Sequence, residues 1–252
     1  MNETNEAPAA VAGRNPVLEL LRSGRTVECV YVQSGPGRGP LGRIVAMAKD
    51  RGIPVKDATA QKLQALTGVD SHQGVAAVVA AWDYAALEDV VAAAGDGPLL
   101  LVLCDGIEDP HNLGAIIRTA EAAGAHGVII PKRHSAGLTA AAVKAAAGAA
   151  AHLPVVRVPN LTACMEELRK DHGMWFYCAD MDGAPWCQTD FAGPVGLVVG
   201  SEGFGVSRLV REHCDFVVSL PMLGQVGSLN ASVAAGVILY EIARQRQGIK
   251  AK

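Results

Sequence analysis

Six short apolar runs in the second part of the chain constrain its fold most strongly. Continuous apolar runs of this length are typical of strands buried in a parallel sheet. Helical patterns fill the gaps, at about residues 113–124, 139–147, 161–171, 207–213 and 230–246. Strands that alternate with helices predict an α/β fold whose parallel sheet is covered on both faces. The expected strands are Leu99–Cys104, Gly127–Ile130, Val155–Val158, Trp175–Ala179, Val195–Val199 and Phe216–Leu220.

The first part of the chain predicts a second, smaller α/β unit of about 70 residues. Helical patterns cover 16–22, 41–51 and 60–66, and strand patterns cover 27–32, 53–55 and 74–80. An Ala-rich helical stretch that ends in Gly-Asp-Gly-Pro follows. We therefore expect a front domain over 10–82, a linker over 83–97 and a rear domain over 98–248.

Composition excludes several classes of protein. Half of the residues are hydrophobic and 19% are charged, which is enough for a sizeable core and excludes disorder along the whole chain. No apolar run is long enough to cross a membrane, and the first residues lack the pattern of a secretory signal. The six cysteines form no Cys-x-x-Cys pair, so we expect reduced thiols, no metal site and a cytoplasmic protein.

Charge is distributed unevenly between the two parts. From Arg14 to Lys62 there are nine Lys or Arg against four Asp or Glu, whereas from Ala81 onward there are thirteen against eighteen. A basic front part predicts a docking surface for a polyanion. Ordinary surface charge is the alternative explanation.

Three loops that follow expected strands are rich in functional residue types, and ligands of open α/β sheets bind beyond such strand ends. They begin at Asp105, Gly200 and Pro221. The first strand leads into no Gly-x-Gly turn and the second ends at Pro131-Lys132, so a Rossmann dinucleotide site is disfavoured. The glycines of the later loops permit close backbone approach to a ligand, although they are equally compatible with ordinary turns.

Three segments in these loops carry a resemblance to a known family. Residues 109–120 read Asp-Pro-His-Asn-Leu-Gly-Ala-Ile-Ile-Arg-Thr-Ala, residues 197–207 include Gly-Ser-Glu-Gly-Phe-Gly, and residues 220–234 include Gly-Ser-Leu-Asn-Ala-Ser. In order and spacing they resemble the signatures of the SpoU (TrmH) branch of the SPOUT methyltransferases. Residues 13–21 and 72–76 resemble the RNA-binding domain of the members that act on ribosomal RNA, a domain similar to small ribosomal proteins.

The resemblance implies a deep trefoil knot in the rear domain, a homodimer, and S-adenosylmethionine as cofactor. Matching positions imply functional residues. For catalysis they are Asn112, Arg118, Glu202 and Asn230. For the cofactor they are Gly200, Leu220, Met222, Ser228 and Leu229. For RNA we expect Arg14, Asn15, Arg22, Arg25, His72 and Gln73. Asn112 could instead cap a helix that begins near Leu113.

The implied reaction is 2′-O-methylation of a ribose in RNA, at a guanosine of 23S rRNA near the peptidyl-transferase centre. Three alternatives stay open. The substrate could be tRNA, the methylated rRNA site could be a different one, or the chain could be a non-catalytic RNA-binding module. Arg118 is matched to an arginine of the family that removes the hydroxyl proton or positions the substrate. The first role is demanding, because a guanidinium is almost always protonated.

Overall fold

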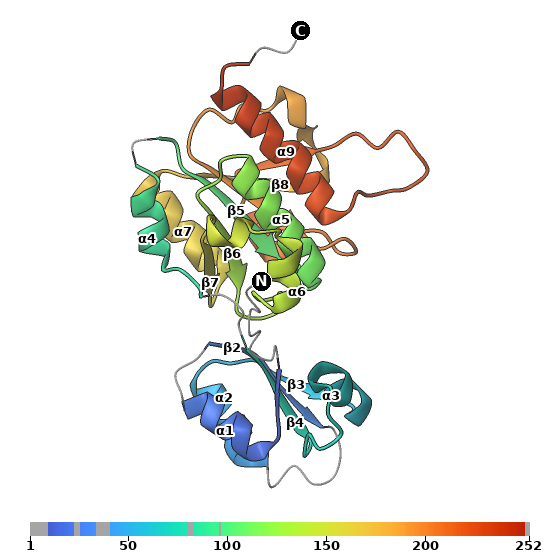
Figure 1. Cartoon of the computed structure of the whole chain (residues 1–252). Coiled ribbons are helices and arrows are strands. Elements are labelled where there is room, and N and C mark those ends of the chain that lie inside the picture. The colour runs from blue at the N-terminus through green and yellow to red at the C-terminus, as the bar shows by residue number, and fades with distance from the viewer. Residues whose placement is uncertain (1–9, 23–25, 34–40, 80–82, 96, 250–252) are drawn as a thin grey trace, which may run out of the picture. The chain divides into compact units, whose positions relative to one another are not determined.

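The computed structural model describes residues 10–22, 26–33, 41–79, 83–95 and 97–249. The chain divides into two compact units. The smaller runs to Asp83 and includes Gly137–Ala140, and the larger holds the rest of the chain from Tyr84 onward. Figure 1 shows the elements of each unit.

The smaller unit is a four-stranded sheet with helices on both faces. Its strand order is β1-β4-β2-β3, with β2 and β3 parallel and the other pairs antiparallel. Apolar residues of α1 and α2 pack on one face, and Leu63 of α3 packs on the other with Ala58 and Ala76. The elements are β1 (Ala10–Ala12), α1 (Arg14–Arg22), β2 (Val27–Gln33), α2 (Gly42–Asp50), β3 (Val55–Ala58), α3 (Ala60–Thr67) and β4 (Val75–Val79).

The larger unit confirms the predicted α/β fold with a parallel sheet. Six parallel strands lie in the order β10-β8-β9-β5-β6-β7. The strands are β5 (Leu100–Asp105), β6 (Gly127–Pro131), β7 (Val155–Val158), β8 (Trp175–Pro185), β9 (Val195–Gly200) and β10 (Phe216–Ser219). The helices are α4 (Leu87–Ala93), α5 (Pro110–Ala122), α6 (Ala140–Ala145), α7 (Leu161–His172), α8 (Arg208–Glu212) and α9 (Ala231–Arg246).

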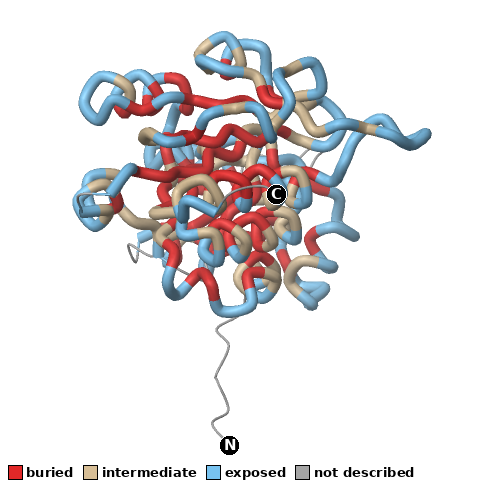
Figure 2. The backbone as a smooth tube through the Cα atoms, turned by 90° about the horizontal axis from the view of Figure 1, so that it is seen from above, coloured by how far each residue is buried: buried red, intermediate tan, exposed pale blue. Residues whose placement is uncertain are grey.

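Helices cover both faces of this sheet, as its uninterrupted apolar strands require. Alternate residues of β5, Leu101 and Leu103, belong to a core cluster with apolar side chains of α4, α7 and α8. On the other face α5 and α9 pack against each other and against the sheet. Figure 2 shows the buried residues concentrated in the interior and the exposed residues in the outlying segments.

Most of the segment expected as a linker over 83–97 is instead packed into the larger unit, which begins at Tyr84. The backbone N–H of Ala85 donates to the carbonyl of Val155 at 2.9 Å, and Ala85 forms a bridge with Val156. Val90 of α4 is fully buried in the core cluster. The apolar residues of this Ala-rich stretch lie on one face of α4, and that face packs on the core cluster, so α4 is part of the helical layer that covers the sheet.

Two other elements differ from the sequence prediction. Helix α5 begins at Pro110, because the Asp109 side chain accepts the N–H of His111 at 2.9 Å and caps the helix. Asn112 therefore lies in the first turn and is not the cap. Strand β8 continues to Pro185 because its pairing with β10 resumes beyond an irregularity in register between Val217 and Val218.

All six cysteines are free, and four of them are buried. Within the part of the chain that the structure describes, no helix is long and apolar enough to span a membrane. The trefoil knot stays a prediction.

Candidate active site

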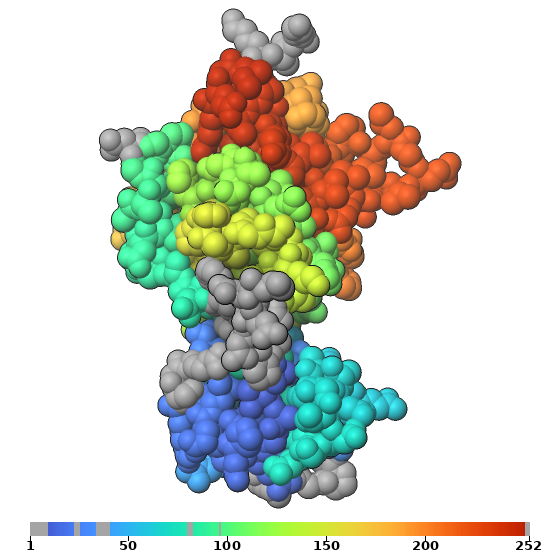
Figure 3. Space-filling model, in the orientation of Figure 1, coloured from blue at the N-terminus to red at the C-terminus, as the bar shows by residue number. Residues whose placement is uncertain are grey.

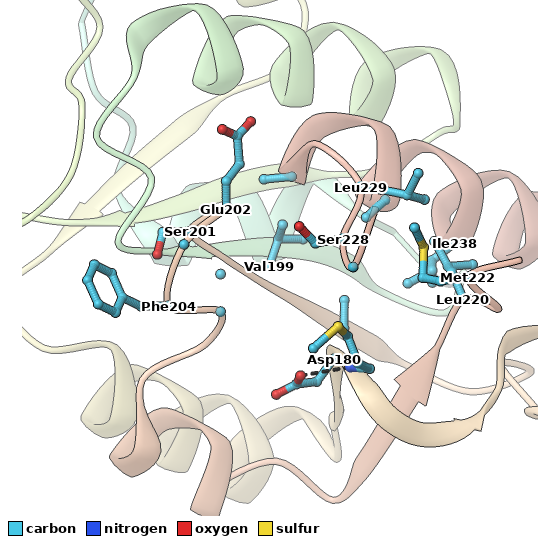
Figure 4. A pocket seen from close by; sticks show the side chains of 18 of the residues that line it. Asp180, Val199, Ser201, Glu202, Phe204, Leu220, Met222, Ser228, Leu229 and Ile238 are labelled. Atoms are coloured by element: carbon cyan, nitrogen blue, oxygen red, sulfur yellow. Dashed lines mark hydrogen bonds between the residues drawn. The ribbon is translucent and has the colours of Figure 1, made fainter. Parts of the chain in front are cut away.

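A cavity of about 440 Å³, which we call the glycine-loop cavity, is enclosed by residues 179–181 of β8, by the loops after β9 and β10, and by α9 (Figure 4). Parallel strands end at one edge of the sheet, so loops from distant parts of the sequence meet there. All five residues predicted to bind the cofactor line this cavity. They are Gly200, Leu220, Met222, Ser228 and Leu229.

The wall formed by Ser201–Gly205 is a tight turn that only glycine at position 200 permits. The Ser201 N–H donates to the Gly205 carbonyl at 3.0 Å, and the Gly205 N–H donates back at 2.9 Å. A Cβ on Gly200 would lie 2.0 Å from the carbonyl carbon of Gly205. The turn therefore folds directly over the end of β9, and its backbone is presented to the cavity.

The third loop extends outward between β10 and α9 before it returns to the cavity (Figures 1 and 3). Its return is fixed by Asn230, which caps α9. The Asn230 Oδ1 accepts the N–H groups of Ser232 and Val233 at 2.9 and 3.3 Å and the Ser232 hydroxyl at 2.6 Å. This cap places Ser228 and Leu229 at the cavity wall.

Three of the four predicted catalytic residues form one hydrogen-bonded cluster. Asn112 Nδ2 donates to Glu202 Oε1 at 3.1 Å, and Asn230 Nδ2 donates to Asn112 Oδ1 at 2.9 Å and to the same Glu202 oxygen. Each side chain comes from a different one of the three loop regions singled out in the sequence. The cluster fixes one carboxylate oxygen of Glu202 at the mouth of the cavity.

Arg118 does not join this cluster. It lies six residues after Asn112 on α5, which corresponds to about 9 Å along the helix and a rotation of about 120°. Its side chain is exposed, and among the described residues no hydrogen bond or ion pair links it to Asn112, Glu202 or Asn230. The fourth predicted catalytic residue is thus held on a neighbouring surface.

Asp180 is a cavity residue that the sequence analysis missed. It follows the core of β8, lines the glycine-loop cavity and lies 3.4 Å from Arg211 Nη1. The same Arg211 guanidinium hydrogen-bonds Asp182 and holds the pKa of that carboxyl below its ordinary value. Asp-Met-Asp after a predicted strand was the available signal, but without the register of β8 it could not be assigned to this cavity.

The charges that face the glycine-loop cavity are all negative. Among its described lining residues the acidic ones are Asp180 and Glu202, and none is Lys, Arg or His. Its electrostatics therefore favour a cationic ligand.

Five of the six residues predicted to bind RNA are described, all of them in the smaller unit, and four of these five are exposed. Arg14, Asn15 and Arg22 are exposed on α1, and Gln73 is exposed beside them. Gln73 Oε1 accepts the N–H of Arg14 at 3.0 Å.

His72 is the exception, because it is 8% exposed. Its Nδ1 accepts the N–H of Gly74 at 3.0 Å, so this ring supports the loop and is not presented to a ligand. Arg25 lies outside the described residues.

Comparison with known proteins agrees with this geometry. The model of the SpoU rRNA Methylase family matches residues 99–240, and that of the RNA 2′-O ribose methyltransferase substrate-binding domain matches residues 10–85. The chain is 45% identical over 244 residues to the TrmH family tRNA/rRNA methyltransferase YacO of Bacillus subtilis, covering 95% of this chain and 96% of that one.

A second relative and a solved structure give the same result. A tRNA/rRNA methyltransferase of Mycolicibacterium vanbaalenii is 48% identical over 241 residues, which are 94% of this chain and 76% of that protein. The SpoU methyltransferase AviRb of Streptomyces viridochromogenes, solved with AdoMet, superimposes with a TM-score of 0.61 at 30% identity. That match covers 95% of this chain and 90% of AviRb.

Proposed function

Because the chain belongs to the SpoU rRNA methylase family of S-adenosylmethionine-dependent RNA methyltransferases, we propose that it methylates a ribose 2′-hydroxyl of ribosomal RNA. The specific target proposed is a guanosine of 23S rRNA near the peptidyl-transferase centre. The match of the front domain to a 2′-O ribose methyltransferase substrate-binding domain supports ribose over base as the acceptor.

The observation that carries the proposal is the glycine-loop cavity. Its volume of about 440 Å³ is within the usual range for small-molecule sites, and its two carboxylates suit a ligand with a net positive charge. Gly200 and the Ser201–Gly205 turn offer backbone groups that can hydrogen-bond a purine without charged side chains. The residues present therefore fit S-adenosylmethionine.

When bound, S-adenosylmethionine supplies an electrophilic methyl group on a sulfonium. We assign the chain's own residues three tasks. Asn112 and Asn230 hold one oxygen of Glu202, so that its second oxygen can accept the proton of the attacking ribose hydroxyl. The walls exclude water, which favours a reaction in which separated charges are neutralised. Holding the sugar oxygen in line with the methyl carbon supplies much of the remaining rate.

We propose that Arg118 acts in the site of a second copy of the chain, within a homodimer. Val233, Val237 and Tyr240 form an exposed apolar stripe on α9, at the spacing of one helix face. A second copy of the chain would cover this stripe. Since α5 packs against α9, Arg118 would then enter the partner's site, where its fixed positive charge would bind phosphate or stabilise the developing alkoxide.

The RNA contacts proposed for the smaller unit are Arg14, Asn15, Arg22 and Gln73, with His72 supporting their loop. This unit carries the basic surplus of the sequence, so its affinity for RNA should fall steeply with salt.

The test combines the purified protein, S-adenosylmethionine with a labelled methyl group, 23S rRNA fragments and total tRNA. A ribose 2′-O-methyl group protects the adjacent phosphodiester from alkaline cleavage, so the modified nucleotide appears as a gap in the hydrolysis ladder. We expect one gap, at a guanosine of the 23S fragment. Label on tRNA alone, or on a base, would contradict the specific target. Failure to bind S-adenosylmethionine would favour the non-catalytic alternative.

A further inference from the structure

A second cavity of about 780 Å³ lies beside the first, between the carboxyl ends of β5 and β9, and we call it the β5–β9 cavity. In the strand order, β6 and β7 continue on one side of β5, whereas β9, β8 and β10 lie on the other. The chain therefore reverses its direction across the sheet between β5 and β9. Ligands of open α/β sheets bind in the crevice at such a reversal.

The two cavities have one wall in common. Residues Ser201–Gly205 line both, and Glu202 is among them. Asn112 lines the β5–β9 cavity but not the glycine-loop cavity. The hydrogen-bonded cluster thus lies on the border between the two spaces. With one cavity assigned to the methyl donor, the other is in position to hold the molecule that receives the methyl group.

The common wall carries an exposed aromatic ring. Phe204 is 96% exposed at the tip of the turn, and Figure 4 shows its ring directed away from Ser228 and Met222. Exposure of an apolar ring of this size to water is unfavourable, and covering it with a ligand would remove this cost. Unpaired bases of RNA commonly stack on such rings, and this stacking needs no particular base sequence.

The charged residues around the β5–β9 cavity are compatible with an anionic ligand at the edge where Arg133 lies. Asp105 accepts the N–H of Ser207 at 2.7 Å, Asp109 accepts that of His111, and Glu202 is held by two amides. Three of its four carboxylates are therefore engaged by the protein itself, and the fourth, Glu108, lies 3.9 Å from Nδ1 of His134. Arg133, just after β6, is an exposed cation on the cavity wall and suits a phosphate group.

We propose that the β5–β9 cavity receives the acceptor nucleotide, with its base stacked on Phe204, its ribose facing Glu202 and its phosphate at Arg133. This inference rests on the proposed function and adds to it the place of the acceptor.

Five variants, two of them controls at other sites, test the proposal in the methyl-transfer assay. Phe204→Ala should raise the RNA concentration for half-maximal rate at least about fivefold, as expected for one lost base stack, and Phe204→Trp should restore it. Leu223→Ala is the matched control, because Leu223 is 95% exposed and lines neither cavity.

Arg133→Ala should weaken RNA use and lower the slope of its salt dependence by about one counterion. Lys170→Ala removes an equivalent charge near the far end of α7 and should change neither quantity. All five variants are assayed at saturating S-adenosylmethionine. Its affinity should stay within about twofold of wild type in Leu223→Ala, Arg133→Ala and Lys170→Ala, because none of these residues lines the glycine-loop cavity. Unchanged RNA use by Phe204→Ala and Arg133→Ala would overturn the proposal.

A binding measurement separates this proposal from the proposed function. Guanosine 5′-monophosphate is added to the protein saturated with S-adenosylhomocysteine, and saturation-transfer NMR reports contact with the base protons. We expect transfer with wild type and its loss with Phe204→Ala. If the wild-type protein methylates rRNA but wild type and Phe204→Ala give equal saturation transfer to the base protons, the acceptor site at Phe204 is refuted and the proposed function is not. Absent methylation would refute the proposed function whatever the nucleotide signal.

Discussion

Replacing Gly200 by alanine should damage the glycine-loop cavity without unfolding the protein. The added Cβ would lie 2.0 Å from the carbonyl carbon of Gly205 and 2.1 Å from the nitrogen of Val206. Ordinary contact begins near 3.4 Å, so the Ser201–Gly205 turn must move by about 1.4 Å. That displacement breaks the two hydrogen bonds between Ser201 and Gly205, which together contribute about 1–3 kcal/mol.

The displaced turn should also bind the cofactor less well. If S-adenosylmethionine hydrogen-bonds the backbone of the turn in its wild-type position, the loss of one or two of these bonds lowers affinity by about 1–3 kcal/mol, or roughly fivefold to 150-fold. Isothermal titration calorimetry measures this directly, and circular dichroism checks that the fold is retained.

Gly203→Ala is the matched control within the same turn, because a Cβ at Gly203 would meet nothing within 4 Å. It should bind within about twofold of wild type. The reasoning fails if Gly200→Ala binds like wild type, or if Gly203→Ala loses as much affinity.

Three further predictions follow from other contacts. Asn230→Ala removes the cap of α9 and should lower the free energy of unfolding by about 1 kcal/mol and Tm by about 2–4 °C. It should also slow methyl transfer. Thr59→Ala removes the cap of α3 and should lower Tm without changing methyl transfer. Arg118→Ala should keep cofactor affinity and abolish transfer, whereas retained transfer would remove Arg118 from the mechanism. Arg244 holds the pKa of the buried Glu241 carboxyl below its ordinary value. The ion pair therefore contributes its full stability above about pH 4.3, the ordinary pKa of Glu, and this contribution is lost as the pH falls through the lowered pKa. Glu241→Gln should therefore melt earlier than wild type at pH 7, with the difference vanishing in acid; a constant difference across pH would contradict this assignment.

Local patterns were sufficient for most of the elements and for the family's motifs. Apolar runs such as Val155–Val158 identified strands, because a fully buried strand has no polar positions to interrupt it. The resemblance implied Gly200, Ser228 and Leu229 as cofactor residues, and in the structure they line one cavity because the strands that they follow end at one edge of the sheet.

Features that depend on distant contacts were not predictable in the same way. His72 reads as a polar loop residue, and only the fold shows that its ring is buried against its own loop. The β5–β9 cavity has walls from several separate segments, so no single stretch of sequence indicates it. Asp180 lines a cavity from the part of β8 where the pairing with β10 is interrupted, between Cys178 and Ala184, and this interruption cannot be read from the sequence.

The Asn112–Glu202–Asn230 cluster has a consequence for biosynthesis. Asn230 bonds a residue made 118 positions earlier and another made 28 positions earlier. At about 5–20 residues per second, Asn112 is added to the growing chain about 6–24 s before Asn230. Nascent chains that stall or are truncated before α9 therefore lack the assembled reactive groups, and only a nearly completed polypeptide can become competent.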